Sequence, residues 1–127
     1  MKRIVESQIV GWKDSPRRKP LIIRGARQVG KTWLVERVLA RQFDHFAKID
    51  LEERKDLHIH FEGNLDPRKI LEGLELSVGR IVAGKTLLFF DEIQACPRAL
   101  MALRYFYEKM PDLHVVAAGS LLEFAFG

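Results

Sequence analysis

The sequence predicts an α/β fold with a mainly parallel sheet of about four strands and flanking helices. Strand-length apolar runs, such as residues 87–90, alternate with stretches in which apolar residues recur at helical spacing. This alternation favours parallel strands that are joined by right-handed helical crossovers. The chain has 127 residues, of which 47% are apolar, so it fits one small domain with a real core.

The first 20 residues predict an N-terminal helix and a linker that precede the core, residues 21–127. Apolar residues recur at helical spacing over residues 3–13, which indicates a short amphipathic helix, and a polar, proline-bounded linker follows. Strands are expected at residues 21–24, 46–50, 86–90 and 113–118. The charged residues 51–65 give no clear assignment.

Three helices are expected between these strands. The first follows Gly30, and the second begins with Asp66 as its N-cap and Pro67 as its first residue and continues to about Leu76. The third begins at Pro97. Apolar residues at helical spacing identify the first and third helices: Leu34, Val35, Val38 and Leu39 in one, and Leu100, Leu103, Tyr107 and Met110 in the other.

One segment matches the phosphate-binding pattern G-x-x-x-x-G-K-[ST] in full. Its glycines let successive backbone N–H groups turn inward around phosphate oxygens, and the following helix directs its positive end at the same anion. Lys31 is expected to reach the β- and γ-phosphates of a nucleoside triphosphate, and Thr32 to coordinate Mg²⁺. The predicted nucleotide-binding residues are Gly25, Ala26, Arg27, Gln28, Val29, Gly30, Lys31 and Thr32.

A second segment, residues 79–86, satisfies the same pattern. The motif works only between a strand and a helix. Residues 25–32 follow one expected strand and precede a helix, whereas residues 79–86 run straight into another strand. We therefore expect the second match to be fortuitous and residues 25–32 to be the phosphate loop.

Two acids, Asp91 and Glu92, follow the most hydrophobic expected strand. Such a strand delivers side chains to the carboxyl edge of the sheet, where α/β proteins bind ligands. Asp91 is expected to hold Mg²⁺ through water, and Glu92 to orient and polarise the attacking water. The alternative is a solvated loop start, but a phosphate loop whose Lys31 lies 60 residues upstream favours the metal site.

The sequence favours ATP over GTP as the nucleotide. A glutamate directly after the aspartate is typical of RecA-type and AAA-type ATPases. The guanine-reading motif Asn-Lys-x-Asp is absent, because Asn64 is the only asparagine and leucine follows it. Ser120 follows the last expected strand, where AAA-type enzymes place a polar sensor of the γ-phosphate; a simple turn at Gly119 and Ser120 is an equally good interpretation.

The charge distribution leaves a second function open. Residues 1–42 contain 11 lysines and arginines against 3 acidic residues, although the whole chain carries only +4. A basic front half suits polyphosphate, and it also suits a nucleic-acid-binding module. No recognition-helix motif or aromatic stacking array supports that module. Its phosphate contacts would be Arg17, Arg18, Lys19, Arg24 and Arg27.

Composition excludes several other classes of protein. The longest apolar runs are far too short to span a membrane, so a cytoplasmic protein with no membrane partner is expected. Cys96 is the only cysteine, which excludes an internal disulfide and a cysteine-based metal site. We expect Cys96 to be a small, partly buried residue rather than a reactive thiol.

Three blocks of this sequence resemble a family of prokaryotic AAA-type ATPases. They are residues 24–32, residues 88–94 with Pro97, and residues 114–123, in the family's order and spacing. The resemblance implies a RecA-like core that binds ATP and Mg²⁺ on the residues named above. Full-length members continue into further strands and a C-terminal domain, so the chain is expected to be the N-terminal part of the ATPase domain.

That resemblance also implies an incomplete sheet. In RecA-like sheets the phosphate-loop strand lies between the sensor strand and a strand that comes later in the chain. Residues 21–24 are therefore expected to form an open edge, and this chain to self-associate and to hydrolyse ATP slowly or not at all. The implied partner of the ATPase is the missing C-terminal domain or another protein.

Overall fold

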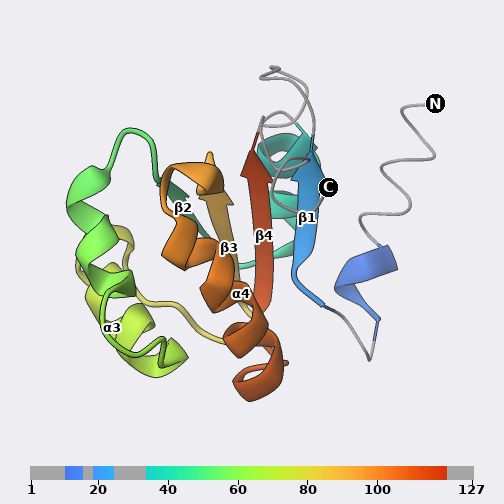
Figure 1. Cartoon of the computed structure of the whole chain (residues 1–127). Helices are drawn as coiled ribbons and strands as arrows, with labels where there is room; N and C mark the ends of the chain where they lie inside the picture. The colour runs from blue at the N-terminus through green and yellow to red at the C-terminus, as the bar shows by residue number, and fades with distance from the viewer. Residues whose placement is uncertain (1–10, 16–18, 25–33, 120–127) are drawn as a thin grey trace.

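The described residues form a four-stranded, all-parallel sheet. The computed structural model describes residues 11–15, 19–24 and 34–119, and Figure 1 shows the sheet that they build. The strands lie in the order β1-β4-β3-β2, and every pairing is parallel. Each expected strand is confirmed to within one residue: β1 is Leu21–Arg24, β2 His45–Asp50, β3 Thr86–Asp91 and β4 His114–Gly119.

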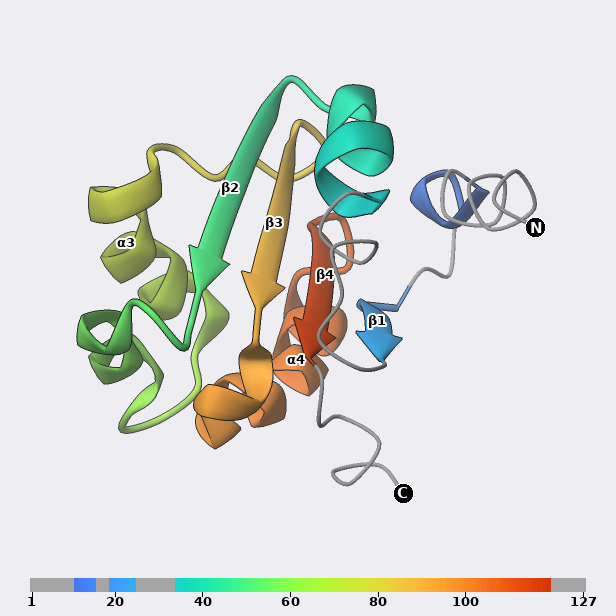
Figure 2. The ribbon, with the colours of Figure 1, turned by 90° about the horizontal axis from the view of Figure 1, so that it is seen from above.

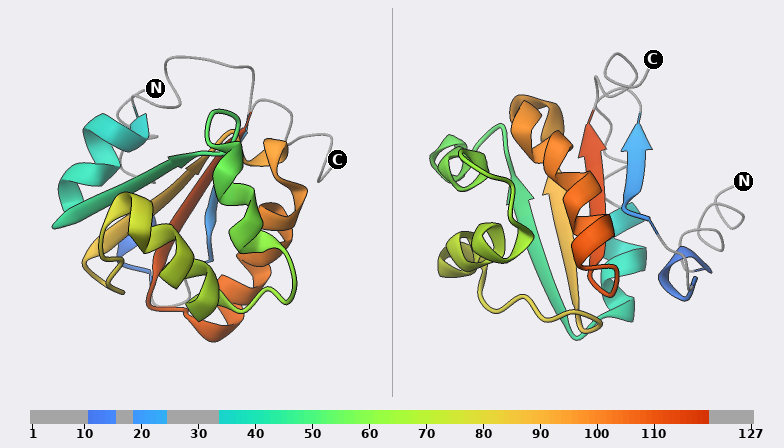
Figure 3. Two further views of the ribbon diagram at one scale, coloured as in Figure 1. Left: turned by 90° about the vertical axis from the view of Figure 1, so that its left-hand side faces the viewer. Right: turned by 60° about the horizontal axis from the view of Figure 1, so that its bottom comes forward.

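Helices cover both faces of this sheet. On one face lie α3 (Pro67–Val78) and α4 (Pro97–Lys109), together with the turn η3 (Lys55–Phe61) (Figure 2). On the other face lies the helical segment η1 (Leu34–Leu39), which continues into the short turn η2 (Ala40–Gln42) (Figure 3). A further short turn, η4 (Ile93–Ala95), links β3 to α4. The α/β class and the flanking helices are therefore as predicted.

Strand β3 is buried on both faces, as its continuous apolar run predicts. Leu88 and Phe90 point into the core beneath α3 and α4, whereas Leu87 and Phe89 point into the core beneath η1. All four side chains are fully buried. Successive residues of a strand face opposite sides of the sheet, so an apolar residue at every position fits a strand that has helices on both sides.

Helix α3 begins and ends where its sequence directs. A side-chain oxygen of Asp66 accepts the Arg68 backbone N–H at 3.1 Å, and Pro67 occupies the first turn, where its missing N–H costs nothing. The helix ends at Val78, and the C-cap residue Gly79 has a φ of 86° that is easy only for glycine. The predicted N-cap is confirmed, and the helix extends two residues beyond Leu76.

Helix α4 is confirmed, but its buried face differs from the predicted stripe. Tyr107, on that stripe, is 36% exposed, and Leu103 is the member of the stripe that is buried. Phe106 enters the core instead, with its ring centroid 6.2 Å from that of Phe90. The buried face of α4 lies beside the predicted stripe and combines small and large side chains; its buried residues are Ala99, Ala102, Leu103 and Phe106.

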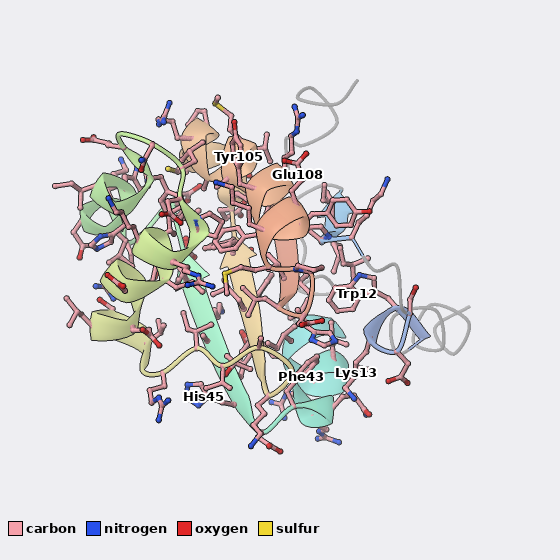
Figure 4. The ribbon with its side chains drawn as sticks, turned by 90° about the horizontal axis from the view of Figure 1, so that it is seen from below. Trp12, Lys13, Phe43, His45, Tyr105 and Glu108 are labelled. Carbon is pink, nitrogen blue, oxygen red and sulfur yellow. The ribbon has the colours of Figure 1, made fainter. Side chains whose placement is uncertain are left out.

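The described part of the N-terminal region lies against the end of η2 and the start of β4. Of the expected helix over residues 3–13, residues 11–13 lie within the described part of the chain, and they are helical. The Trp12 indole N–H donates to the Lys19 carbonyl at 2.6 Å. Figure 4 shows Trp12, Lys13 and Phe43 together, and the His114 ring meets the rings of Trp12 and Phe43 edge to face.

Strand β1 lies at one end of the sheet and, within the described residues, pairs with β4 alone. Among the described residues, β1 therefore has the open edge that the sequence predicts. A hollow of about 330 Å³ lies between β1 and α4, and Ile22, Leu103 and Tyr107 help to line it. Self-association through this edge stays a prediction.

A first prediction concerns the close approach of η3 to α3. A Cβ at Gly73 would overlap the His60 ring, so Gly73→Ala should destabilise the fold by about 1–2 kcal/mol, although alanine favours a helix. Urea unfolding measures this loss. Leu76→Ala is the control, because Leu76 lies on the same helix and is 89% exposed. His60→Ala combined with Gly73→Ala should recover the stability; a double variant no better than the single one would contradict the proposed clash.

Candidate functional site

The carboxyl ends of all four strands meet at one edge of the sheet. The register pairs Arg24 of β1 with Gly119 of β4, and Asp50 of β2 with Asp91 of β3. Parallel pairing makes this unavoidable, because every strand runs in the same direction. The predicted aspartate therefore lies at the edge where open α/β sheets bind their ligands.

Asp91 is a half-buried carboxylate whose ionised form is disfavoured. Its Oδ1 accepts the Glu92 backbone N–H at 2.9 Å. Burial raises the pKa of Asp91, and the charges of Asp50 and Glu92 raise it further, whereas the Glu92 N–H and the Lys48 charge act against the rise. Among the described residues no donor reaches Oδ2. The environment thus leaves a carboxylate oxygen that would gain from a cation.

Glu92 combines a strained backbone with a buried side chain. Its φ of 48° and ψ of 50° place it in the left-handed region, and it is the only described non-glycine residue with a positive φ. Such a conformation costs about 1–3 kcal/mol and is concentrated at functional sites. The side chain is 8% exposed, and its Oε1 accepts the Gln94 amide N–H at 3.0 Å.

The amide of Gln94 is oriented by this contact. A carboxylate only accepts hydrogen bonds, so the amide nitrogen of Gln94 has to face Glu92. Its oxygen then points the other way, where it is buried and meets no donor among the described residues. Buried polar atoms without partners are rare in folded proteins. The turn after β3 therefore contains both the left-handed backbone of Glu92 and the buried Gln94 oxygen that meets no donor among the described residues.

The sequence analysis did not identify the ion pair of Lys48 and Glu36, which lies near Asp91. Lys48 of β2 contacts Glu36 of η1, with 2.6 Å between Nζ and Oε1. Burial lowers the pKa of Lys48, but the hydrogen bond and charge of Glu36, with the charges of Asp91 and Asp50, outweigh it and raise the pKa. No motif marks Lys48. The only signal was its place two residues before an aspartate at a strand end.

Asp50 has a structural role in the turn after β2. Its Oδ1 accepts the backbone N–H groups of Glu52 at 2.9 Å and Glu53 at 3.1 Å. Aspartates commonly cap a turn in this way. Although Asp50 lies opposite Asp91 in the register, one of its oxygens is therefore already committed to the chain itself.

The remaining predicted site residues lie outside the described residues. These are the predicted phosphate loop, residues 25–32, and the predicted sensor, Ser120. Their flanks are described: β1 ends at Arg24, and the next described residues form the helical segment η1. Val35 and Leu39 of η1 are fully buried against the sheet, and Val38 is half-buried. The expected strand before the loop and the expected helix after it are both present.

The second match to the phosphate-binding pattern has a different setting. Residues 79–85 lead into β3, so Thr86 begins a strand rather than a helix. The Thr86 hydroxyl oxygen accepts the Val82 backbone N–H at 3.0 Å, and its side chain is 1% exposed. This segment lies at the amino end of β3, opposite the edge that holds Asp91. The structure confirms that it lacks the strand-to-helix context.

A family model described as an AAA domain matches residues 17–126. The chain belongs to this AAA domain family. The match covers most of the chain and spans every strand described above, so the four-stranded parallel sheet is the core of an AAA-type P-loop ATPase domain. Family membership associates the chain with nucleotide binding. A search of curated proteins finds no match. In the part of the chain that the structure describes, no helix is long and apolar enough to cross a membrane.

The described side chains fit a Mg²⁺ ion that a nucleotide brings with it. Among them no three acidic, histidine or cysteine side chains gather as a metal-binding group. Mg²⁺ keeps several waters and takes one or two carboxylates plus phosphate oxygens in such sites, so a dedicated cage is not needed. The half-buried carboxylate of Asp91 suits that mode of binding.

A second prediction follows from the environment of Asp91. Because its pKa is raised in the folded state, ionisation of this carboxyl opposes folding. The penalty is absent below the pKa of the unfolded chain, grows as the pH rises towards the raised folded-state pKa, and is complete above it. Asp91→Asn should therefore raise the midpoint of thermal unfolding at neutral pH in the absence of Mg²⁺ and nucleotide. Asp112→Asn, at an exposed position, is the control. A lower midpoint for Asp91→Asn would show that the charge stabilises the fold.

Proposed function

We propose that the chain binds Mg·ATP on residues 25–32 and that it forms the N-terminal part of an ATPase domain. The observation that carries this proposal is the placing of Asp91 and Glu92. Asp91 ends the buried strand β3 at the carboxyl edge of a parallel sheet, and Glu92 follows it. Strand β1, which precedes residues 25–32 in the sequence, ends at that same edge. Family membership supports nucleotide binding.

The roles of the residues follow from chemistry and position. Backbone N–H groups of residues 25–32 would surround the phosphates, and Lys31 would contact the β- and γ-phosphates. Thr32 and Asp91, the latter through water, would hold Mg²⁺, which offsets charge on the phosphates when bound. Glu92 would orient and polarise the attacking water, and Ser120 would sense the γ-phosphate.

The backbone of Glu92 supports its proposed role. A side chain at a strained turn, held by the Gln94 amide, has few alternative positions, and a fixed carboxylate is what the polarisation of a single water needs. Hydrolysis would then drive a conformational change in a domain or partner protein that acts with this core.

A third prediction separates the two phosphate-loop patterns. Lys31→Ala should weaken Mg·ATP binding by about 100-fold or more, because a charge-assisted contact with phosphate is lost. Isothermal titration calorimetry measures this. Lys85→Ala is the matched control, since it removes the equivalent lysine of residues 79–86, and its affinity should stay within about twofold of wild type. If the two variants exchanged these results, residues 25–32 would not be the phosphate loop.

A fourth prediction tests Glu92 in a form of the protein that hydrolyses ATP. Glu92→Gln should keep the affinity for Mg·ATP but lower the single-turnover rate by about 100-fold or more, because an amide does not accept a proton from water. Rapid-quench measurement of phosphate release gives the rate. Glu62→Gln, at an exposed position, should turn over normally. Full activity of Glu92→Gln would remove Glu92 from catalysis and leave the binding proposal intact.

A further inference from the structure

Lys48 lies near the proposed nucleotide site but has no role in the function proposed above. It lies on β2, two residues before Asp50, and therefore on the same face of the sheet as Asp50. Asp50 is the register partner of Asp91. Phe89, which is directly opposite Lys48, packs in the core beneath η1, so this is the face that η1 covers.

The Lys48 side chain joins η1 to this edge of the sheet. Its Nζ lies 2.6 Å from Glu36 Oε1, and both side chains are about one-third exposed, at 36% and 35%. An ion pair with this exposure contributes little to stability. Lys48 does affect the local charge, because its ammonium group attracts the carboxylates of Glu36, Asp50 and Asp91.

The coupling between Lys48 and Asp91 runs in both directions. The negative charge of Asp91 favours the charged form of Lys48, and the positive charge of Lys48 favours the charged form of Asp91. Among the described residues, Lys48 is the basic group whose charge acts on Asp91. The carboxyl edge thus carries a built-in cation next to the acid proposed to hold Mg²⁺.

We infer that Lys48 is a positioning residue that sets how strongly nucleotide binding depends on Mg²⁺. This inference rests on the proposed function. The Lys48 ammonium group, held by Glu36, offsets negative charge at the edge that receives the triphosphate. Free ATP carries two more negative charges than Mg·ATP, so a change in local charge acts more strongly on free ATP. The ratio of the two dissociation constants, Kd for ATP in EDTA over Kd for Mg·ATP, reports the effect.

Two variants break the same ion pair and should move this ratio in opposite directions. Lys48→Met removes a positive charge, so the ratio should rise by about threefold to tenfold at 0.1 M salt. Glu36→Gln removes a negative charge and leaves Lys48 in place, so the ratio should fall. A purely structural link between η1 and β2 would give both variants the same direction.

Two further variants serve as controls. Lys48→Arg keeps the charge and should keep the ratio within about twofold of wild type. Lys85→Met removes a lysine at the opposite end of the sheet, and it should leave the ratio unchanged, which controls for the net charge of the chain. Circular dichroism confirms that each variant is folded; if Lys48→Met did not fold, the sign of the Glu36→Gln shift would decide alone.

The outcomes distinguish this inference from the function on which it rests. Wild-type chain that binds neither ATP nor Mg·ATP would overturn the proposed function and the role of Lys48 with it. Wild-type binding that depends on Mg²⁺, with opposite shifts in Lys48→Met and Glu36→Gln, supports the role. Equal binding by wild type, Lys48→Met and Glu36→Gln, or shifts in one direction, would overturn the role of Lys48 and leave the proposed function standing.

Discussion

The parallel register of β3 with its neighbours determines where chemistry can occur in this domain. Asp50 is opposite Asp91, and Phe90 is opposite Ala117, so the carboxyl ends of these strands open at one edge. A shift of one residue would exchange the two faces of β3. Asp91 would then leave the face covered by η1. Burial of β3 on both sides makes such a shift costly, because every side chain of its apolar run fills a core.

This constraint explains why the edge tolerates unfavourable features. The pKa of Asp91 is raised, the backbone of Glu92 is strained, and the Gln94 amide oxygen meets no donor among the described residues. Each of these costs stability, and each lies within four residues of the end of β3. Packing of the apolar strand offsets the cost, so the turn can keep a conformation that is poor for stability, of a kind that is concentrated at functional sites.

The sequence was sufficient for the strands, because their signals are local. The apolar run that ends at Asp91 has the length of a strand and forms β3. Asp66 and Pro67 define the start of α3, where Asp66 accepts the Arg68 backbone N–H. The buried face of α4 was not predictable in the same way. Apolar residues lie on two neighbouring faces of that helix, and the fit of Phe106 against Phe90 decides between them.

The irregular residues between β2 and α3 also depend on distant partners. The His58 ring N–H donates to the Leu51 carbonyl at 2.7 Å, and Arg98 of α4 donates to the Phe61 carbonyl at 2.7 Å. Neither contact leaves a periodic pattern in the sequence.

The candidate site was predictable only in part. The order of Asp91 and Glu92 could be read from the sequence, whereas the left-handed backbone of Glu92 and the position of the Lys48 charge arise from tertiary contacts. A motif specifies the types of residue at a site, whereas the fold determines the environment of each side chain. The two copies of the phosphate-binding pattern show this most directly, because at Thr86 the hydroxyl that would face a metal instead accepts a backbone N–H at the amino end of a strand.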